Sequence, residues 1–285
     1  MASFGIITQL CTTIQGEGPT AGKSCLLIRV GNCILNCSYC DTKWTNNLKP
    51  LAVPRLTSTT DSLPFKIDTV SSMNIFIDLC RQHVKNYNIS HVLITGGEPL
   101  MNLEFLEKLF KNLKEKLNIN SVEIETNGVL LDLTIAPLVR LNEMKVQLNI
   151  SPKLNPDFYP NKDIKSIYDI TRLFQTKYAI LDKLIKILPA DSISANFKFV
   201  YYKEIEENLN EFIESVNPKI PIVIMPLTPD YTKYKKEFSF IQAYRKSCYD
   251  AIDYCLRKNY TFSPRLHIWV FNNFKHRNEF EDCKK

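Results

Sequence analysis

The sequence predicts an α/β fold, a full or partial (β/α) barrel formed by a single domain over residues 1–285. Short apolar runs of strand type alternate repeatedly with longer stretches of helical periodicity. Polar motifs follow directly after Val30, Thr95, Glu125 and Ile150. Parallel strands joined by right-handed crossovers bring their carboxyl ends to one edge of a sheet. We therefore expect the chemistry of the protein at that edge.

The strands are expected where apolar and β-branched residues form short runs that end in turn signals. The predicted strands are Cys25–Val30, His91–Thr95, Val122–Glu125, Val146–Ile150, Phe197–Tyr201, Pro221–Met225 and Leu266–Phe271. The first runs into Gly31, and the second ends at Gly96 and Gly97, so both are followed by a turn.

The helices are expected where apolar residues recur every three or four positions. The predicted helices are Met73–Tyr87, Leu103–Leu117, Leu133–Arg140, Ile167–Leu181, Glu204–Val216 and Phe238–Lys258. One stretch breaks the alternation: Asn46–Ser72 is rich in Pro, Thr, Ser and Asn. A long loop of this kind is either functional, such as a lid, or a passive surface insertion, and the sequence leaves both interpretations open.

The composition is typical of an ordered globular chain. Hydrophobic residues make up 45% and charged residues 23% of the sequence, and the net charge is +6. A basic balance attracts phosphate-rich partners. The lysines mostly stand beside acids, as in residues 110–117, and no nucleic-acid motif is present. We therefore expect an ordinary solvated surface and no direct nucleic-acid partner.

No apolar run approaches the ~18–20 residues that a membrane-spanning helix needs. The stretch Met1–Leu10 lacks the basic region and apolar core of a signal peptide. We therefore expect a cytoplasmic protein without membrane contact. Nine cysteines in such a chain indicate metal or redox chemistry rather than disulfides. Dispersed cysteines are expected to be small buried apolar residues; these are Cys11, Cys25, Cys80, Cys248, Cys255 and Cys283.

The remaining cysteines, Cys33, Cys37 and Cys40, form a C-x-x-x-C-x-x-C cluster. Four thiolates would close a structural zinc site or a simple electron-transfer cluster, whereas three leave one iron of a 4Fe–4S cluster open. An open iron can bind the amino and carboxylate groups of S-adenosylmethionine, whose reductive cleavage releases a 5′-deoxyadenosyl radical. Tyr39 supports this interpretation, since an aromatic ring there can pack along the adenine. A zinc site completed by a distant histidine or cysteine, or a chance spacing, remains open.

Four further motifs accompany the cysteines. They are T-I-Q-G-E-G (Thr13–Gly18), I-T-G-G-E-P (Ile94–Pro99), E-T-N-G (Glu125–Gly128) and S-P-K (Ser151–Lys153). With these motifs the chain resembles the radical S-adenosylmethionine superfamily and, within it, the 7-carboxy-7-deazaguanine synthase family. The resemblance runs from Thr13 to about His267, is weakest in Asn46–Ser72 and Pro156–Asp191, and implies a partial barrel of the radical SAM type.

The resemblance implies a set of substrate residues. They are Ile14, Gln15, Gly16, Glu17, Arg29, Thr95 and His267. Arg29 is expected to hold the substrate carboxylate, because a guanidinium fork matches a carboxylate in bidentate fashion. Gly16 and Gly18 would let the backbone approach a flat ring. Without the resemblance, Q-G-E-G is an ordinary turn. At the C-terminal end, either Arg265 or His267 would reach the substrate, or the segment is an ordinary strand end.

The resemblance also implies residues that line the S-adenosylmethionine site. They are Tyr39, Cys40, Asp41, Gly96, Gly97, Glu98, Glu125, Asn127, Ser151, Pro152, Lys153, Met225, Pro226, Leu227 and Thr228. The carboxylate of Glu98 and nearby carbonyls would receive the cofactor's ammonium group. Without the resemblance, these motifs are a glycine turn before a helix, an Asn-Gly turn and a Ser-Pro loop.

Thr42, directly after C-D, is implied to be a ligand of magnesium, which prefers oxygen ligands and keeps several waters. The alternative role of Thr42 is to cap the turn after the cluster. His83 and His91 are expected to be structural and His276 solvated.

The reaction implied by the resemblance begins with a one-electron donor such as flavodoxin or ferredoxin. The adenosyl radical removes a hydrogen from 6-carboxy-5,6,7,8-tetrahydropterin, and ring contraction with loss of ammonia gives 7-carboxy-7-deazaguanine for queuosine-type nucleosides. A homodimer is expected.

Two rival functions remain open. One is a radical SAM activase that places a glycyl radical on a partner protein, against which Q-G-E-G and Arg29 argue. The other is a non-enzymatic metal-binding module, which would not need polar motifs at successive strand ends.

Overall fold

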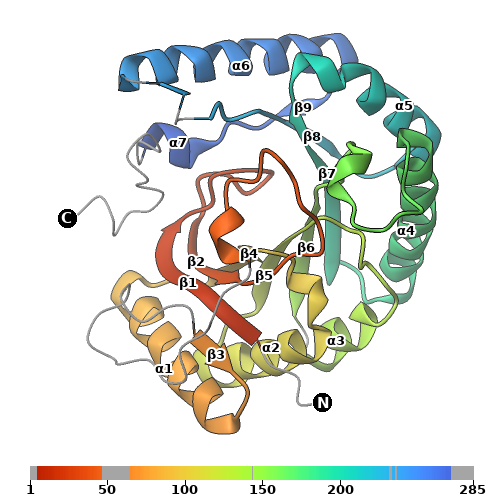
Figure 1. The fold of residues 1–285 in the computed structure, drawn as a ribbon. Coiled ribbons are helices and arrows are strands. Elements are labelled where there is room, and N and C mark those ends of the chain that lie inside the picture. The colour runs from red at the N-terminus through yellow and green to blue at the C-terminus, as the bar shows by residue number, and fades with distance from the viewer. Residues whose placement is uncertain (1–4, 47–64, 143, 231–232, 235, 271–285) are drawn as a thin grey trace.

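A curved nine-stranded sheet forms the centre of the molecule, and its strands follow the order β3-β1-β2-β4-β5-β6-β7-β8-β9 (Figure 1). The computed structural model describes residues 5–46, 65–142, 144–230, 233–234 and 236–270. The strands are β1 (Gly5–Ile14), β2 (Ser24–Val30), β3 (Phe65–Ile67), β4 (His91–Gly96), β5 (Ser121–Thr126), β6 (Lys145–Ile150), β7 (Ile193–Tyr201), β8 (Ile222–Pro226) and β9 (Thr261–Phe262).

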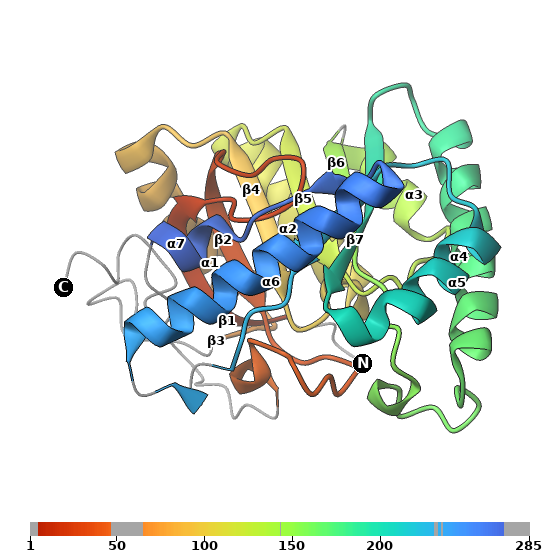
Figure 2. The same ribbon diagram turned by 90° about the horizontal axis from the view of Figure 1, so that it is seen from above.

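Helices α1 to α6 lie around the outside of this sheet, and α7 packs against α6 (Figures 1 and 2). They are α1 (Val70–Tyr87), α2 (Leu103–Leu117), α3 (Ile135–Asn142), α4 (Ile167–Ile187), α5 (Glu206–Val216), α6 (Glu237–Lys258) and α7 (Leu266–Val270). Among the helices that the structure describes, none is long and apolar enough to cross a membrane.

The neighbouring strands in the series β2-β4-β5-β6-β7-β8-β9 pair in parallel. Strand β1 pairs antiparallel with both β2 and β3. Parallel neighbours need long crossovers, which the helices supply, whereas an antiparallel pair needs only a loop. The β1–β2 loop, residues 15–23, is such a connection. The two edge strands of the described sheet, β3 and β9, do not pair with each other. The predicted partial barrel is therefore confirmed.

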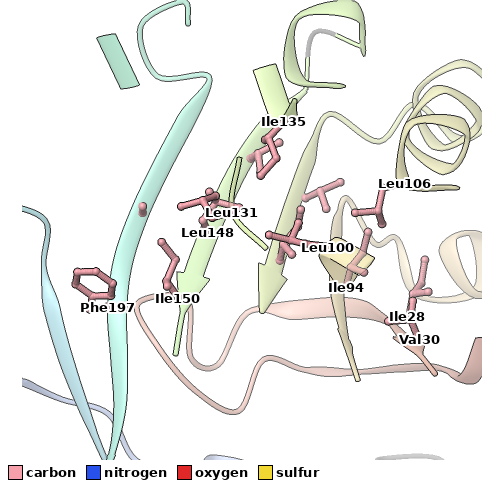
Figure 3. Close-up of a cluster of buried hydrophobic side chains, with 14 of the residues drawn as sticks. Ile28, Val30, Ile94, Leu100, Leu106, Leu131, Ile135, Leu148, Ile150 and Phe197 are labelled. Carbon is pink, nitrogen blue, oxygen red and sulfur yellow. The ribbon is translucent and has the colours of Figure 1, made fainter. Parts of the chain in front are cut away.

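The outer face of the sheet is apolar and packs against the helices. Figure 3 shows Ile94, Leu148 and Phe197 on the strands, with Leu106 of α2 and Ile135 of α3 opposite them, and all five are buried. Fully burying a side chain of this size contributes about 1.5–3 kcal/mol. This interface fixes the curvature that brings the carboxyl ends of the strands together.

The inner face of the sheet is polar, because side chains of alternate residues point to it. The polar residues on β5 to β7 are Glu123, Glu125, Gln147, Asn149, Asn196 and Lys198. Buried parallel strands are usually apolar on both faces. A polar lining in the middle of this sheet therefore marks the inside of the barrel as the functional side.

Asparagine ends several of the crossover helices. Asn88, Asn118, Asn217 and Asn259 adopt the left-handed conformation at the carboxyl ends of α1, α2, α5 and α6. This position usually takes glycine, and asparagine is the next best residue there. The chain has 8 glycines, and it uses asparagine to turn the backbone back toward the next strand.

One predicted strand is wrong. Leu266–Val270 is helix α7, and the last strand is the short β9, Thr261–Phe262. A five-residue apolar run does not distinguish a strand from a buried helical turn. Ile268 is buried against Phe240 and Tyr244 of α6, which selects the helix. Phe271, the predicted last residue of that strand, lies outside the described residues.

The predicted insertion, Asn46–Ser72, is partly wrong. Phe65–Ile67 forms the edge strand β3, and α1 begins at Val70. Thr69 and Ser72 form a capping box that starts α1. Residues 47–64 lie outside the described residues. The sequence also predicted no strand over Gly5–Ile14, where β1 runs.

Candidate active site

The cysteine cluster lies in the loop that follows β2. Backbone hydrogen bonds hold both ends of this loop: the Gly31 N–H donates to the Ile6 carbonyl over 2.8 Å, and the Asn32 N–H donates to the Thr45 carbonyl over 2.9 Å. Cys37 is buried, and Cys33 and Cys40 are partly exposed. The three thiols thus lie on one short loop at the carboxyl end of a strand, as predicted.

Burial governs the acidity of these thiols. It raises the pKa of Cys33, and it raises the pKa of Cys37 to about 11. A thiolate at either of the other positions would raise the pKa of Cys37 further, while Lys153 opposes the effect. Metal ligation requires thiolates, so a bound cation must supply the missing stabilisation. The donor set therefore fits a cationic iron–sulfur cluster.

The other cysteines are structural where they are described. Cys11, Cys25, Cys80, Cys248 and Cys255 are buried, which confirms the expectation, and Cys283 lies outside the described residues. Within the described part of the chain, no three His, Cys, Asp or Glu side chains are arranged around a single metal ion. Thiolates of a cubane cluster bind separate irons and need not converge on one point.

The two glycines of G-G-E-P allow β4 to end against the cysteine loop. A Cβ atom on Gly97 would lie 1.7 Å from the Asn32 carbonyl oxygen, and one on Gly96 would lie 2.3 Å from the Val30 carbonyl oxygen. Gly96 also has φ +118°, a conformation that side chains rarely adopt. The Gly97 and Glu98 N–H groups donate to the Val30 and Asn32 carbonyls over 2.9 and 2.7 Å. These glycines position the cluster loop.

Glu98 ties β4 to β5. Its carboxylate is buried and accepts hydrogen bonds from the Thr126 hydroxyl at 2.6 Å, the Asn127 N–H at 2.7 Å and the Leu100 N–H at 3.0 Å. Burial raises its pKa in spite of these bonds. The carboxylate therefore has protein partners already, and its predicted contact with the cofactor's ammonium group stays a prediction.

The E-T-N-G and S-P-K motifs meet beside the same loop. The Asn127 amide lies 3.8 Å from the Cys33 sulfur, and the Lys153 ammonium donates to the Ser151 hydroxyl at 3.0 Å. The charge of Lys153 lowers the pKa of both Cys33 and Cys37, so this lysine faces the cluster site. The structure thus brings all the predicted strand-end motifs around the cysteines.

Tyr39 and Thr42 flank the last cysteine. The Tyr39 ring packs edge-on against Phe158, with 5.2 Å between ring centroids. Thr42 stands at the start of a short 3₁₀ helix, but its side chain makes no capping hydrogen bond. Its hydroxyl lies 3.6 Å from the Cys40 sulfur instead. The alternative interpretation of Thr42 as a cap is therefore wrong.

The β1–β2 loop carries the T-I-Q-G-E-G motif across the inner face of the sheet. Its Glu17 carboxylate accepts from the Arg265 guanidinium at 2.7 Å and from the Lys198 ammonium at 2.9 Å. Lys198, only 2% exposed, also donates to Glu125 at 2.6 Å. Arg265 reaches further and donates to Asp41, the residue after Cys40. This chain of ion pairs connects the loop to the cysteine cluster.

Electrostatic coupling keeps these groups charged. Burial would raise the pKa of Glu17, but Arg265 and Lys198 hold it well below its usual value. The side chain of Asp41 is 48% exposed, and its contact with the Arg265 guanidinium lowers its pKa. The two carboxylates beside Lys198 raise its pKa against the effect of burial. Glu17, Asp41 and Lys198 are therefore ionised at neutral pH.

His267 and Gly16 are close neighbours. A Cβ atom on Gly16 would lie 2.1 Å from His267 Nδ1, so only glycine fits beneath the ring. Burial and the Arg265 charge lower the pKa of His267 to about 4, which keeps the imidazole neutral near pH 7. Of the two predicted alternatives, Arg265 and His267, the structure places both beside Glu17.

Arg29 has spare hydrogen-bonding capacity. Its Nε donates to Gln9 at 2.7 Å, and its guanidinium lies 6.0 Å from the centroid of the Trp44 ring. Within the described residues, its two terminal nitrogens have no protein acceptor shown. Its charge acts on both Asp41 and His267, so it faces the ion-pair network.

The remaining predicted residues lie at the same ends of the strands. The Thr95 hydroxyl donates to Glu125 at 3.1 Å, and Thr228 accepts from Arg265. Met225 and Pro226 are buried at the end of β8. Leu227 is partly buried, and its carbonyl accepts from Ser247. His83 and His91 are buried and hydrogen-bonded to Thr12 and Glu123, which fits a structural role. His276 lies outside the described residues.

Lys198 and Glu123 were not predicted as site residues. Their sequence signal is the alternation of polar residues along Ser121–Thr126 and Ile193–Tyr201, which indicates a polar inner face. That alternation shows which residues point inward. It does not show that Lys198 pairs with Glu17, which is 181 positions away in the chain.

Comparison with known proteins agrees with this geometry. The family model of the radical SAM superfamily matches residues 27–232. A 7-carboxy-7-deazaguanine synthase of Hyperthermus butylicus is 28% identical over 272 residues, covering 93% of this chain and 92% of the relative. A protein of the same name from Buchnera aphidicola is 29% identical over 181 residues, covering 62% of this chain and 72% of the relative.

Among solved structures, QueE from Escherichia coli aligns with a TM-score of 0.56 and 21% sequence identity. The alignment covers 93% of this chain and 95% of that protein. At this identity the likeness establishes a shared fold.

Proposed function

The chain belongs to the radical SAM superfamily, and from this premise we propose that it converts 6-carboxy-5,6,7,8-tetrahydropterin into 7-carboxy-7-deazaguanine with loss of ammonia. Members of the superfamily carry a 4Fe–4S cluster and use S-adenosylmethionine, so the chain is an enzyme with these cofactors. The relatives named 7-carboxy-7-deazaguanine synthase support the choice of reaction.

The observation that carries the proposal is the pair of ion pairs made by Arg265. This side chain binds Asp41, next to Cys40, and Glu17, in the T-I-Q-G-E-G loop. It thereby holds the loop implied to bind substrate directly against the loop implied to bind the cluster. A hydrogen is transferred only when donor and acceptor are held within contact distance, so this adjacency is what the chemistry requires.

In the proposed site, Cys33, Cys37 and Cys40 hold the cluster. Bound S-adenosylmethionine supplies hydrogen abstraction from the substrate. The Arg29 guanidinium faces Asp41 and His267, and it binds the substrate carboxylate through its terminal N–H groups. A lysine in this position would offer a point charge rather than a planar fork.

The network around Lys198 orients the ring of the substrate. Lys198 holds the Glu17 and Glu125 carboxylates in fixed positions. Ionised carboxylates accept hydrogen bonds from the amino and ring N–H groups of a pterin. His267, neutral at pH 7, adds no charge that would compete with Arg29 for the substrate carboxylate. The chain's residues thus bind and orient, and they exclude water from the reacting atoms.

We expect a one-electron donor such as flavodoxin or ferredoxin, and a homodimer. An anaerobic assay tests the proposed reaction. Reconstituted protein receives S-adenosylmethionine, magnesium, a reductant and the carboxypterin, and product mass and 5′-deoxyadenosine are measured. We expect both products from the native chain and neither from Cys37→Ala. Cofactor cleavage without the deazaguanine product would contradict the proposed substrate, and cleavage by Cys37→Ala would contradict the cluster assignment.

Magnesium binding at Thr42 is a separate part of the proposal. The hydroxyl is not used as a cap and lies beside Cys40, where it can act as an oxygen ligand together with substrate oxygens and water. We expect Thr42→Ala to reduce the response of turnover to added magnesium while the iron content stays at its normal value. Thr45→Val, which removes a hydroxyl that donates to the Thr42 carbonyl, is the control. An unchanged magnesium response in Thr42→Ala would remove Thr42 as a ligand.

A further inference from the structure

Glu123 stands at the centre of a buried polar cluster below the ion-pair network. Its side chain on β5 is 0% exposed. One carboxylate oxygen accepts from the Gln15 amide at 2.6 Å and from the Asn149 amide. The other accepts from the Thr20 hydroxyl at 2.5 Å and from His91 Nε2 at 2.9 Å. These four donors occupy the four acceptor positions of a carboxylate.

The four donors come from three different places in the fold. His91 lies on β4 and Asn149 on β6, the two strands that flank β5. Gln15 and Thr20 both belong to the β1–β2 loop. Burial would raise the pKa of Glu123, but the hydrogen bonds from His91, Thr20 and Gln15 lower it. The carboxylate is therefore ionised, and it joins the loop to the middle of the sheet.

Glu123 also determines how the Gln15 amide is oriented. The Gln15 NH₂ group donates to Glu123 and, at 3.3 Å, to Glu125. Because the NH₂ group faces two carboxylates, the side-chain oxygen Oε1 of Gln15 faces the other way. It accepts from the Glu17 N–H at 3.1 Å. The backbone of Glu17 is thus fixed through Gln15 by a residue that Glu17 does not touch.

The loop has several anchors besides Glu123: the Gly18 N–H donates to the Ser263 hydroxyl over 2.7 Å, and the Leu266 N–H donates to the Gly16 carbonyl over 2.8 Å. Two backbone hydrogen bonds join the ends of the loop, each over 2.8 Å. The Gly22 N–H donates to the backbone carbonyl of Gln15, and the backbone N–H of Gln15 donates to the Lys23 carbonyl. These bonds close the base of the loop, and Thr20 lies toward the other end. By binding both Gln15 and Thr20, the Glu123 carboxylate connects two positions of the loop to the middle of the sheet.

We propose that Glu123 is a positioning residue, whose carboxylate fixes the β1–β2 loop and so sets the places of Gln15 and Glu17 in the substrate site. The part of this proposal that concerns substrate rests on the proposed function. The fixing of the loop does not, and it is measurable in protein without substrate. Glu123 is separated from substrate by Gln15, so it acts through the loop and not on the reacting atoms.

Three variants test the proposal. Glu123→Ala removes all four acceptors. Glu123→Gln keeps the shape but places an NH₂ group where donors already converge, and the Thr20 hydroxyl, or His91 in its other tautomer, must change role to accept from it. Thr20→Val removes a bond from the side of the loop and leaves the sheet unchanged. Glu206→Gln is the matched control, since Glu206 accepts from Tyr201, Lys203 and Arg257 at a site away from the loop.

The first measurement is hydrogen–deuterium exchange of a peptide that covers residues 15–23, without substrate. We expect faster exchange in Glu123→Ala, Glu123→Gln and Thr20→Val, and native exchange in Glu206→Gln. Effects of Glu123→Ala and Thr20→Val should not add in the double variant, because Glu123→Ala already removes the acceptor of the Thr20 hydroxyl. Unchanged exchange in the Glu123 and Thr20 variants would overturn the proposal.

The second measurement is steady-state turnover of the carboxypterin by reconstituted enzyme. We expect KM for the pterin to rise roughly tenfold in Glu123→Gln, as for one lost charge-assisted hydrogen bond. The kcat value, the KM for S-adenosylmethionine and the iron content should stay near native values. Equal losses in every parameter would show a general structural role and overturn positioning. If Glu123→Ala does not fold, Glu123→Gln and Thr20→Val decide the question.

The two proposals fail in different ways. If the native chain does not turn over the carboxypterin, the proposed function is wrong. Hydrogen–deuterium exchange of residues 15–23 still tests whether Glu123 fixes the loop. If the native chain is active and the variants exchange and turn over as it does, the function stands and the role of Glu123 is wrong.

Discussion

Single residues in this protein act through partners that are far away in the sequence. Arg265 binds Glu17, 248 positions away, and Lys198 binds Glu17 from 181 positions away. The spacing of the cysteines and of G-G-E-P is local, so the sequence predicted those residues. A buried ion pair depends on which strands become neighbours, and only the folded chain determines that. This is why Arg265 was predicted with an open role and Lys198 was not predicted at all.

We expect Arg29→Ala to raise the KM for the carboxypterin by roughly ten- to a hundredfold, as for the loss of a bidentate charged contact. The KM for S-adenosylmethionine should change little, because Arg29 is implied to hold the substrate carboxylate and its Nε donates to Gln9, not to a residue of the cofactor site. Steady-state kinetics with each substrate varied in turn measures both values. Arg81→Ala, which removes an exposed arginine paired with Asp78, is the control. Equal changes in both KM values would contradict the assignment.

Gly97→Ala is expected to prevent cluster assembly. The new Cβ would overlap the Asn32 carbonyl oxygen, which belongs to the backbone of the cysteine loop and cannot rotate away. Iron per chain after anaerobic reconstitution measures the effect, and we expect most of it to be lost. Gly22→Ala is the matched control: its Cβ meets nothing within 4 Å, although φ +91° strains it by ~1–2 kcal/mol. Full iron content in Gly97→Ala would show that the loop adapts.

At the scale of elements, sequence periodicity predicted most of the fold. Leu103–Leu117 is predicted and observed with the same bounds, because its apolar face is unambiguous. The errors lie at the two ends of the sheet. The strands β1 and β3, at one end of the sheet, and the short helix α7 depend on pairing and packing partners that periodicity does not contain. Strands β5 to β7 are predicted as strands, but the alternation of polar and apolar residues along one strand does not show that the polar side chains of all three form one lining.

Packing of α2 against the sheet makes a direct contribution to stability. Leu109 is 0% exposed, so Leu109→Ala would leave a cavity in the core. We expect the free energy of unfolding to fall by about 2–5 kcal/mol. Urea denaturation followed by circular dichroism measures it. Glu107→Ala, at an exposed position of the same helix, should change stability by less than about 0.5 kcal/mol. A change of that small size in Leu109→Ala would mean that α2 is loosely packed.

At the scale of the whole molecule, the buried charges make stability depend on pH. The folded-state pKa of His267 is lowered to about 4, whereas an unfolded histidine titrates near ~6.5. As pH falls through this window, the unfolded chain binds a proton that the folded chain does not, so stability decreases. Below about pH 4.5, the carboxylates of Glu17, Glu123 and Asp41, whose pKa values are lowered, add to the loss as they are forced to protonate.

From this linkage we expect the free energy of unfolding to fall by about 2 kcal/mol between neutral pH and about pH 5 through His267 alone. Urea denaturation of the cluster-free chain at both pH values measures the difference. In His267→Asn the decrease should be smaller, since the titrating group is gone. His83, whose pKa burial also lowers, remains in the variant and accounts for a residual slope. An equal decrease in both proteins would show that His267 does not contribute.

That residues 1–285 form one domain stays a prediction.

The ion pair between Arg265 and Asp41 has a consequence for how the site forms during synthesis of the chain. Arg265 stands 20 positions before the last residue, Lys285, whereas the cysteines lie near the start of the chain. A chain that leaves the ribosome from its N-terminus presents the thiols long before the residue that secures their loop. Delivery of iron during synthesis would therefore meet a cysteine loop that still lacks its contact with Arg265, and the finished site forms only after Arg265 has left the ribosome.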